Sequence, residues 1–300
     1  MKTSDFMYDL PEDRIAQTPA EPRDASRLMV LDRKNCDIAH RVFRDVAEYL
    51  REGDVLVVNE TRVIPARLIG ERETGGACEV FLLKQLAPKK WECLVRPGRR
   101  MRPGAKASFG GGRLACEVLS VTPTGERVVG FTCSGAFEEA LDELGETPLP
   151  PYIHEKLDDR ERYQTVYARL PGSAAAPTAG LHFTDELLAR IRDKGVDVVR
   201  VLLHVGLGTF RPVKAEDIED HEMHSEYFEV SEEAARRINA ARERGGRIVA
   251  VGTTSVRTLE SASDAGGKVL PKKGTTDIFI YPGYTFKAVD ALIKIGRAHV

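Results

Sequence analysis

The chain lacks the features that mark several large classes of protein. No apolar run in its 300 residues approaches the roughly 20 residues of a membrane-spanning helix. Residues 1–10 contain two Asp and no long apolar stretch, so we expect no secretory signal there. Acidic and basic residues nearly cancel, 46 against 44, and this net charge of −2 excludes a globally basic nucleic-acid-binding protein. A local basic patch is still compatible with that balance.

Paired cysteines are also absent. The five cysteines stand alone at wide spacing, without a CxxC motif, and their number is odd. This argues against a disulfide framework and favours a reducing cytoplasm, so we predict a cytoplasmic protein. Four of them alternate with apolar residues in strand-like runs, which predicts small buried side chains. The five are Cys36, Cys78, Cys93, Cys116 and Cys133.

The chain shows two different patterns of predicted secondary structure. Strand-like runs recur at short spacing over 78–83, 90–95, 114–121 and 127–133, with turn signals between them, which predicts a small all-β barrel or sandwich. Elsewhere helices and strands alternate: strands over 55–58, 196–203 and 247–251, and helices over 45–52, after Thr184, after Ser231 and over 256–263. Alternation of this kind favours an α/β layer with partly parallel strands.

The predicted fold class is therefore α/β, with a larger mixed α/β, barrel-like domain and an inserted small all-β barrel domain. We expect the α/β catalytic domain to be discontinuous, over 1–73 and 148–293. The inserted β domain then spans 74–147, between the turn signals "TGG" at Thr74 and "PLPP" at Pro148.

Three glycine- or arginine-containing segments are candidate binding loops. Arg62 and Arg67 flank a proline after the strand at 55–58, and their planar donors suit carboxylate or phosphate, unless they form ordinary ion pairs. In "AAAPTAGLHF", Thr178 and Gly180 permit close approach of a ligand. Gly206 and Gly208 in "LHVGLGTF" leave N–H groups free, but the third glycine of a dinucleotide-binding motif is missing.

Histidines recur in these segments. His182 stands just before a helix N-cap and His204 at a strand end, positions that suit a neutral base or a hydrogen-bonded core residue. His221, His224 and Glu226 lie within six residues, and the two histidines share a face if that segment is helical. The spacing is not HExxH, so metal binding, acid–base chemistry and structural hydrogen bonding all stay open.

A strand, a glycine and hydroxyl side chains occur together in "VAVGTTS". A turn at Gly252 precedes Thr253 and Thr254 at a predicted helix start, with Arg257 in the first turn, and free N–H groups and the helix dipole there form an anion site. The GK[ST] of a Walker loop is absent, and ordinary N-capping by the hydroxyls is the alternative.

The predicted β domain carries a basic stretch. Nine Lys or Arg lie between Lys84 and Arg113 with Glu92 as the one acidic residue, and Trp91 lies among them. Such a surface suits RNA backbone contact and base stacking, although a solvated basic face is the alternative. The arginines that we assign to this contact are Arg96, Arg99, Arg100 and Arg102.

The segments together resemble the S-adenosylmethionine:tRNA ribosyltransferase-isomerase family of queuosine biosynthesis. The resemblance runs in family order over nearly the whole chain. It rests on "RDASRLMVLDR" from Arg23, "GDVLVVNETRVIPARL" from Gly53, "TGG" from Thr74, "PLPPYI" from Pro148, "ERYQTVYA" from Glu161, "AAPTAGLHF" from Ala175, "LHVGLGTFRPV" from Leu203, "HEMHSE" from His221, "AVGTTSVRTLES" from Ala250 and "TDIFIYPGY" from Thr276. Glu60 stands where the family leads us to expect Asp or Asn.

The resemblance implies that the ribosyl part of S-adenosylmethionine moves onto the aminomethyl group of 7-aminomethyl-7-deazaguanine in tRNA and is isomerised, giving epoxyqueuosine. S-adenosylmethionine is then a consumed substrate, no metal or other cofactor is needed, and we expect a monomer without a membrane partner. We predict His204 or His224 as the base, with His182, His221 and Glu226 as further candidates. A metal-dependent hydrolase and a non-catalytic RNA-binding protein are the rival functions.

The last residues depart from the family. Its pattern holds through "AVDALI" and then stops, and 294–300 reads "KIGRAHV", of which "IGRAHV" is also encoded by a common sequencing adapter. We expect 294–300 to be a non-native tail on a C-terminally truncated chain that expresses poorly and has little activity. His299 is therefore excluded from every candidate site.

Overall fold

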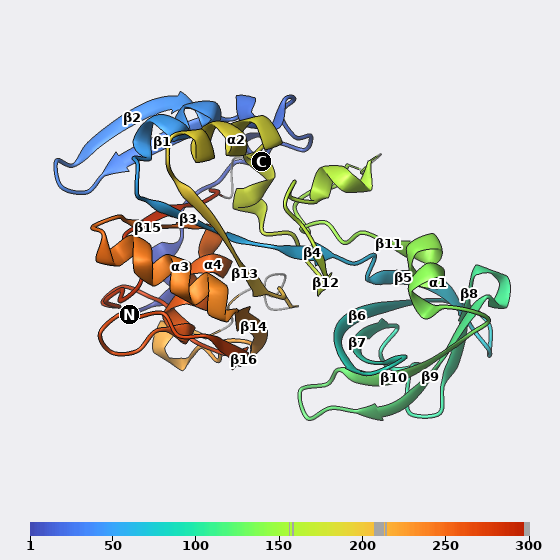
Figure 1. Cartoon of the computed structure of the whole chain (residues 1–300). Coiled ribbons are helices and arrows are strands. Elements are labelled where there is room, and N and C mark those ends of the chain that lie inside the picture. Colours follow the sequence, from blue (N-terminus) through green and yellow to red (C-terminus); the bar gives the residue numbers. More distant parts are fainter. Residues whose placement is uncertain (156, 158, 207–212, 214, 297–300) are drawn as a thin grey trace. The chain divides into compact units, whose positions relative to one another are not determined.

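The computed structural model describes residues 1–155, 157, 159–206, 213 and 215–296, which form two compact units (Figure 1). Unit 1 comprises Met1–Arg62, Pro151–Leu170 and Ala176–Val300, and unit 2 comprises Val63–Pro150 and Pro171–Ala175. The chain passes between the units at four places, after Arg62, Pro150, Leu170 and Ala175. The first lies in β4 (Thr61–Val63) and the third in β12 (Leu170–Ser173), which pair with each other.

Unit 2 is a closed antiparallel barrel. Its strands are β5 (Arg67–Arg72), β6 (Ala77–Ala87), β7 (Lys90–Arg96), β8 (Lys106–Phe109), β9 (Leu114–Val121) and β10 (Arg127–Cys133). They follow the order β5-β6-β7-β10-β9-β8, and pairing between β5 and β8 closes the ring. The predicted small β barrel is confirmed, and its sheet includes β5, which we had assigned to the α/β domain with the rest of 1–73.

The barrel forms because apolar and polar residues alternate along each strand. In β6 the side chains of Cys78, Val80 and Leu82 are buried while their neighbours are more exposed. Cys93 and Cys116 join the same core, and burial raises the pKa of the Cys116 thiol to about 12. Helix α1 (Phe137–Leu144) packs its apolar face on this core, and the short strand β11 (Gly145–Glu146) pairs antiparallel with β5. The prediction of buried cysteines holds for these three, whereas Cys133 is half-buried and Cys36 is exposed.

Unit 1 is built on a six-stranded mixed sheet. The strand order is β16-β14-β13-β3-β15-β17. The strands are β3 (Val55–Asn59), β13 (Asp197–Leu203), β14 (Glu226–Val230), β15 (Ile248–Val251), β16 (Lys272–Thr276) and β17 (Ala291–Ile293). The four strands β13, β3, β15 and β17 are parallel, so their carboxyl ends meet at one edge. Strand β14 is antiparallel to both of its neighbours, β13 and β16.

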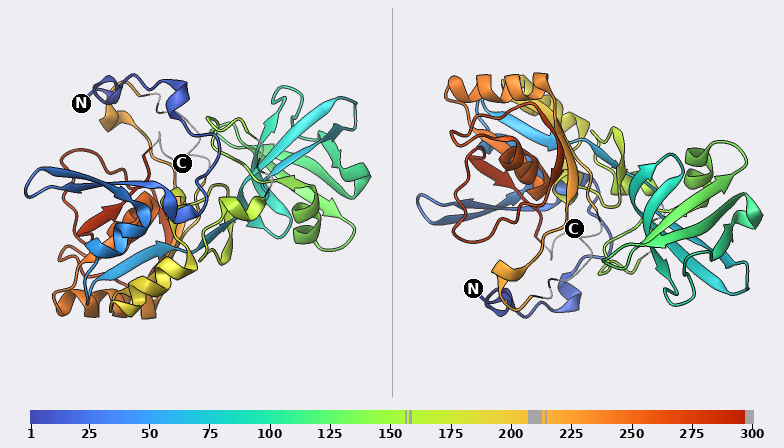
Figure 2. Two further views of the ribbon diagram at one scale, coloured as in Figure 1. Left: turned by 90° about the horizontal axis from the view of Figure 1, so that it is seen from above. Right: turned by 90° about the horizontal axis from the view of Figure 1, so that it is seen from below.

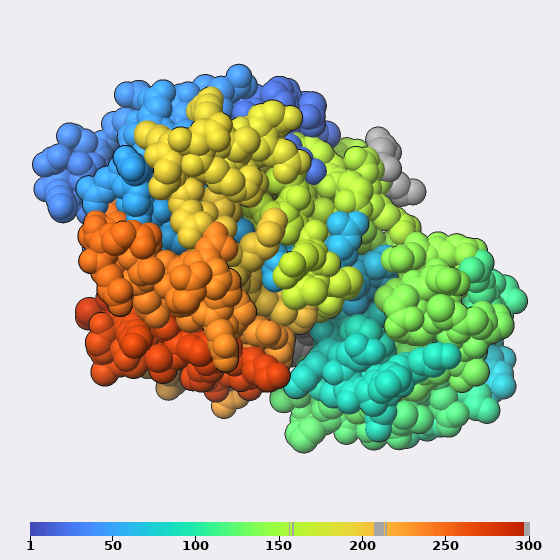
Figure 3. All heavy atoms as spheres, in the orientation of Figure 1, coloured from blue at the N-terminus to red at the C-terminus, as the bar shows by residue number. Residues whose placement is uncertain are grey.

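Three α-helices pack on this sheet. They are α2 (Asp185–Asp193), α3 (Glu232–Glu243) and α4 (Gly252–Ala262), and the outer faces of α2 and α3 form part of the surface of unit 1 (Figure 3). Thr184 and Ser231 accept N–H groups of the first turns of α2 and α3, as their positions in the sequence predict. Leu188 and Ile191 of α2 pack with Leu56 of β3 in one buried cluster. Helices α3 and α4 pack against β13 and β15, and both are visible from two further sides in Figure 2.

Two sequence predictions about helices are wrong. The segment expected as a helix over 45–52 is a 3₁₀ helix, η4 (Phe43–Tyr49), which ends before Gly53 because Leu50 is extended. Helix α4 begins at Gly252 instead of residue 256, since Gly252 adopts a φ of +80° that starts the helix directly after β15. Arg257 consequently lies in the second turn of α4.

Short elements complete unit 1. Strands β1 (Arg27–Asp32) and β2 (Asp37–Val42) form a separate hairpin. Besides η4, the 3₁₀ turns in the described residues of unit 1 are η1 (Thr3–Phe6), η2 (Glu12–Arg14), η3 (Arg23–Ala25), η6 (Arg160–Tyr163), η7 (Thr178–His182) and η9 (Ile218–Asp220), and η5 (Gly110–Gly112) belongs to unit 2. Of the helices in the described residues, none is long and apolar enough to cross a membrane.

Candidate active site

The carboxyl edge of the parallel strands in unit 1 gathers several of the predicted residues. Strand β3 lies between β13 and β15, so the chain leaves this edge toward both sides of β3. Loops diverge at such a point and leave room for a ligand. Asn59 and Thr61 follow from β3, His204 and Gly206 from β13, and Gly252 from β15.

His204 is held at this edge by three contacts. Its ring Nδ1 is 2.8 Å from Thr61 Oγ1, and its backbone N–H donates to the Tyr227 carbonyl at 2.9 Å. Its ring also stacks on Tyr227, with 5.9 Å between the ring centroids. Burial lowers the pKa of His204 below its usual 6.5, so the ring is neutral at pH 7. A neutral, oriented imidazole at a strand end can accept a proton.

The first turn of α4 is the second feature of this edge. Gly252, Thr253 and Thr254 open the helix, and no side chain in the described part of the chain caps it. The predicted N-capping by hydroxyls is therefore not found in those residues. Thr253 is exposed, and Thr254 Oγ1 is buried without a hydrogen-bond partner among the described residues. Free N–H groups and the helix dipole favour an anion at this position.

Glu226 and Arg257 form a buried ion pair beside this edge. Arg257 Nη1 bonds Glu226, and its Nη2 donates to the carbonyls of His224 at 3.2 Å and Thr276 at 3.1 Å. The other oxygen of Glu226 accepts the Gly206 N–H at 2.8 Å. Both side chains are over 90% buried. These contacts join α4, β14 and β16, so the ion pair stabilises the packing of the helix on the two strands.

His182 belongs to a neighbouring network. Ser26 Oγ donates to the Arg23 carbonyl at 3.0 Å, so its lone pair accepts the Nδ1–H of His182 at 2.9 Å. The ring packs 5.2 Å from Phe43, and burial lowers its pKa. Its Nε2 is therefore the acceptor nitrogen of a neutral ring. Thr178 is half-buried at the start of the same 3₁₀ turn.

Gly180 is required by close packing. A Cβ built on it lies 2.0 Å from Tyr167 Oη and 2.8 Å from Thr165 Cγ2. Any side chain would displace Tyr167, whose buried hydroxyl has no hydrogen-bond partner in the described residues. Glycine at this position therefore permits close packing against Tyr167, rather than the close approach of a ligand that the sequence suggested.

The histidine cluster at 221–226 is not helical. Residues 221–225 form no regular element, so the shared helical face that we considered does not exist. His221 packs edge-on against Phe279 at 4.9 Å, and the carbonyl of His224 accepts from Arg257. Within the described ranges no group of three His, Cys, Asp or Glu side chains could hold a metal ion.

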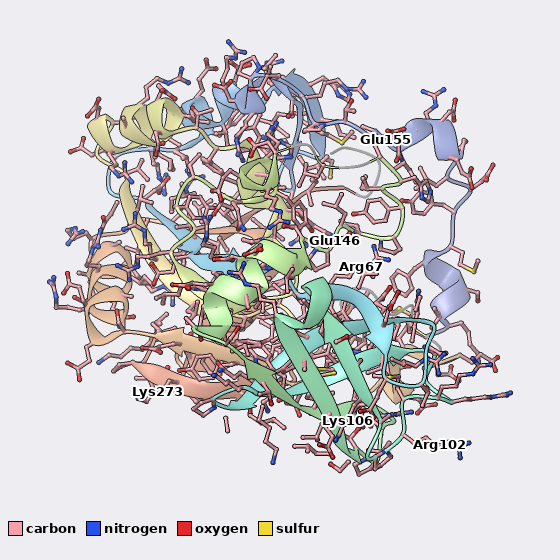
Figure 4. All side chains as sticks on the ribbon, turned by 90° about the vertical axis from the view of Figure 1, so that its right-hand side faces the viewer. Arg67, Arg102, Lys106, Glu146, Glu155 and Lys273 are labelled. Carbon is pink, nitrogen blue, oxygen red and sulfur yellow. The ribbon has the colours of Figure 1, made fainter. Side chains whose placement is uncertain are left out.

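The two arginines of "RVIPARL" are in separate units. Arg62 pairs with Glu161 in unit 1, whereas Arg67 of β5 pairs with Glu79 at 3.0 Å and Glu146 at 3.3 Å in unit 2. Arg67 and Glu146 lie side by side in Figure 4. Both arginines therefore form ordinary ion pairs, which is the alternative to a binding loop that the sequence left open.

The four arginines assigned to tRNA are exposed on unit 2. Arg102 donates Nε to the Arg99 carbonyl at 2.9 Å, and in the described residues none of the four has an acidic partner within ion-pair distance. Arg102 and Lys106 lie at the surface of the barrel (Figure 4). Trp91 is only 6% exposed and packs on Phe137, so its predicted availability for base stacking is wrong. The alternation of β7 turns its side chain into the core.

Comparison with known proteins identifies the family. The family model described as "Queuosine biosynthesis protein" matches residues 3–294. The chain belongs to this family. It is 63% identical to the S-adenosylmethionine:tRNA ribosyltransferase-isomerase of Symbiobacterium thermophilum and 60% to that of Desulfitobacterium hafniense, each over 294 residues, 98% of this chain and 86% of the relative. The crystal structure of S-adenosylmethionine tRNA ribosyltransferase from Thermotoga maritima is similar, with 38% identity, a TM-score of 0.50, and coverage of 97% of this chain and 84% of that one.

In this member of the queuosine biosynthesis family, sequence reasoning overlooked Asn59 and Thr61 as site residues. Both are fully buried, and both bond to the segment that carries His204. The available signal was their position directly after an unbroken buried strand. Gly208 and residues 297–300, including His299, lie outside the described residues.

Proposed function

We propose that this chain transfers and isomerises the ribosyl moiety of S-adenosylmethionine onto the aminomethyl group of 7-aminomethyl-7-deazaguanine in tRNA. The product is epoxyqueuosine in tRNA, and adenine and methionine are released. S-adenosylmethionine is consumed as a substrate, and no other cofactor takes part. The protein acts as a monomer in the cytoplasm. Membership of the family supports the reaction. The observation that supports the site of this proposal is His204, which is buried and held by Thr61 at the carboxyl edge of the sheet.

His204 is the general base of this proposal. The sulfonium of S-adenosylmethionine acidifies the adjacent ribose C–H, and a neutral imidazole can remove that proton. The Nδ1 side of the ring contacts Thr61, which leaves Nε2 for the substrate. The lowered pKa keeps His204 in its base form at neutral pH, so turnover should fall only when the pH drops below the usual histidine range.

The first turn of α4 binds the carboxylate of the methionine part. Gly252, Thr253 and Thr254 contribute N–H groups that no described side chain caps. A helix N-terminus stabilises an anion through these groups and its dipole. Both parts of the site belong to unit 1.

The exposed arginines of the barrel bind the tRNA backbone. Arg96 ends β7, and Arg99, Arg100 and Arg102 follow it before β8, without acidic partners in the described residues. Neutralising phosphates releases counterions, so binding should weaken steeply with salt.

The reaction is tested by incubating the protein with S-adenosylmethionine and precursor tRNA. Adenine and methionine should appear only when tRNA is present. His204→Ala should lower kcat by about two to four orders of magnitude. His40→Ala is the matched control, because His40 is an exposed histidine on β2. Methylated tRNA with S-adenosylhomocysteine would overturn the proposed reaction, and near-normal turnover of His204→Ala would overturn the assignment of the base.

The tRNA surface is tested by salt titration of binding. Arg102→Gln should reduce the slope of log Kd against log salt by about one unit if that arginine contacts one phosphate. Arg192→Gln in unit 1 removes an exposed arginine outside the barrel and should leave the slope unchanged. Equal slopes in both variants and the unaltered protein would place the RNA contact elsewhere.

A further inference from the structure

One buried side chain replaces the backbone at the end of the β3–β13 ladder. Asn59 lies opposite Val201 in the parallel register, and the Glu60 N–H makes the last backbone bond, 3.0 Å to the Val201 carbonyl. Beyond it, the Asn59 carboxamide pairs with Leu203 in the manner of a peptide group. Its Oδ1 accepts the Leu203 N–H at 3.0 Å, and its Nδ2 donates to the Leu203 carbonyl at 2.9 Å.

This arrangement lets β3 and β13 diverge while the backbone N–H and carbonyl of Leu203 both keep a hydrogen-bond partner. The main chain after Asn59 continues into β4, while Leu203 keeps both of its hydrogen bonds. Asn59 is 0% exposed, so a backbone group of Leu203 left unpaired here would be desolvated without compensation and would destabilise the fold. Only an amide side chain offers a donor and an acceptor in the required positions.

The same carboxamide reaches both neighbours of His204. Asn59 Oδ1 also accepts the Thr61 N–H at 3.2 Å, and Thr61 Oγ1 is 2.8 Å from His204 Nδ1. Leu203 directly precedes His204 in the chain. One side chain thus fixes the backbone that carries the imidazole and the hydroxyl that contacts its ring.

We propose that Asn59 is a positioning residue for His204, which orients the ring through Leu203 and Thr61 with Nδ1 toward Thr61 and Nε2 free for the substrate. This inference rests on the proposed role of His204 as the base. In that role Nδ1 carries the hydrogen and donates it to Thr61, and Nε2 accepts the proton from the ribose carbon.

Among the described residues, the ionisable side chains of β14 and Glu60 after β3 already have hydrogen-bond or ion-pair partners. From β14, the Tyr227 hydroxyl donates to Glu229 at 2.9 Å, and Glu226 pairs with Arg257 of α4. After β3, Glu60 pairs with Arg169 at 3.0 Å and lies 3.9 Å from Arg200. A carboxylate placed at position 59 would therefore be a new charge in the network of His204.

The test compares Asn59→Asp with Asn239→Asp. Asn239 of α3 makes the same two-bond pairing with the Val269 backbone, with its Nδ2 2.8 Å from the Val269 carbonyl and its Oδ1 3.0 Å from the Val269 N–H. Both variants lose one donor to a backbone carbonyl, but only Asn59→Asp places a negative charge next to the Thr61–His204 pair. Because a nearby carboxylate favours imidazolium, the pKa of His204 and the acidic limb of the kcat profile should both rise by about one unit.

Two readouts are measured on the full chain: the pH profile of kcat with S-adenosylmethionine and precursor tRNA, and the His204 titration by NMR, assigned with His204→Ala. A shift in Asn59→Asp with none in Asn239→Asp supports the positioning role. Equal loss of stability in the two variants with an unshifted His204 pKa would overturn it.

Thr61→Val keeps the test decisive if Asn59→Asp does not fold. Valine has nearly the shape of threonine but cannot bond the ring, so kcat should fall about 10- to 100-fold with KM for S-adenosylmethionine nearly unchanged. The ¹⁵N shifts of His204 should also change as the tautomer is released. Unchanged kcat and shifts would reject the inference, whereas an active His204→Ala with a displaced His204 pKa in Asn59→Asp would reject only the proposed base.

Discussion

The two ends of the parallel strands in unit 1 differ in how their polar groups are satisfied. At the amino end, Asp54 is fully buried and accepts from the backbone N–H groups of Arg51 and Arg247 and from the Arg247 guanidinium. Asp290 accepts the Ile248 N–H at the same end. At the carboxyl end, the first turn of α4 has no side-chain cap in the described residues, and Thr254 Oγ1 has no partner there.

This difference indicates that the amino end of the strands contributes to stability and the carboxyl end to function. A buried carboxylate with every bond made ties β3 to β15, so its contribution is to the folded state. Free N–H groups and a neutral histidine are costly features that a ligand can complete. Variants at the amino end should therefore change unfolding, and variants at the carboxyl end should change turnover.

Glu226→Gln gives the largest expected effect on stability, because Glu226 lies beside the functional end but is bonded like a residue of the structural end. The change leaves Arg257 buried without its counter-charge, which should cost about 3 kcal/mol in the free energy of unfolding. Urea unfolding and kcat are measured on the same preparation. If kcat falls 100-fold or more while stability is unchanged, Glu226 takes part in proton transfer and its assignment to a structural role is wrong.

Asp54→Asn should destabilise the fold by about 2 kcal/mol, because an amide nitrogen would face donors of Arg51 and Arg247. The expected turnover per folded molecule is unchanged, since Asp54 lies at the opposite end of β3 from His204. Asp37→Asn on the exposed β2 strand is the control. If Asp54→Asn loses kcat at a temperature where it is fully folded, the amino end of the strands also contributes to turnover, contrary to this prediction.

Local patterns in the sequence predicted much of this fold. The N-caps Thr184 and Ser231, the buried strand at 55–58 and the alternation in unit 2 act over a few residues, and each appears where expected. The α/β class with an inserted barrel is confirmed. The start of α4 was placed too late because Gly252 was interpreted as a turn before the helix, whereas its positive φ lets the helix begin at that residue.

The candidate site was predicted less completely, because its contacts join distant segments. Thr61 and His204 are 143 residues apart, and Glu226 and Arg257 are 31 apart. No local pattern indicates that Arg257 is paired with Glu226 or that Asn59 bonds Leu203. Trp91 was misjudged for a different reason. The two-residue alternation of β7 that buries Cys93 also turns Trp91 inward, but Trp91 was interpreted from the basic residues around it in the sequence.

Acid should lower the free energy of unfolding through protonation of Asp54, and this contribution should be absent in Asp54→Asn. Burial alone would raise the pKa of Asp54, but hydrogen bonds from the Arg247 guanidinium and from the N–H groups of Arg51 and Arg247 outweigh it and lower the pKa below 3.8. The stability from this ionised group is fully present above the pKa of the unfolded chain, about 3.9, and is lost as the pH falls through the lower folded value. Urea unfolding between pH 6 and pH 3 should therefore show the difference between the unaltered protein and Asp54→Asn shrinking only below about pH 4. This is the smallest of the three effects, because it concerns only the ionisation of one carboxyl group. A difference that stays constant down to pH 3 would mean that the charge of Asp54 does not hold the two strands together.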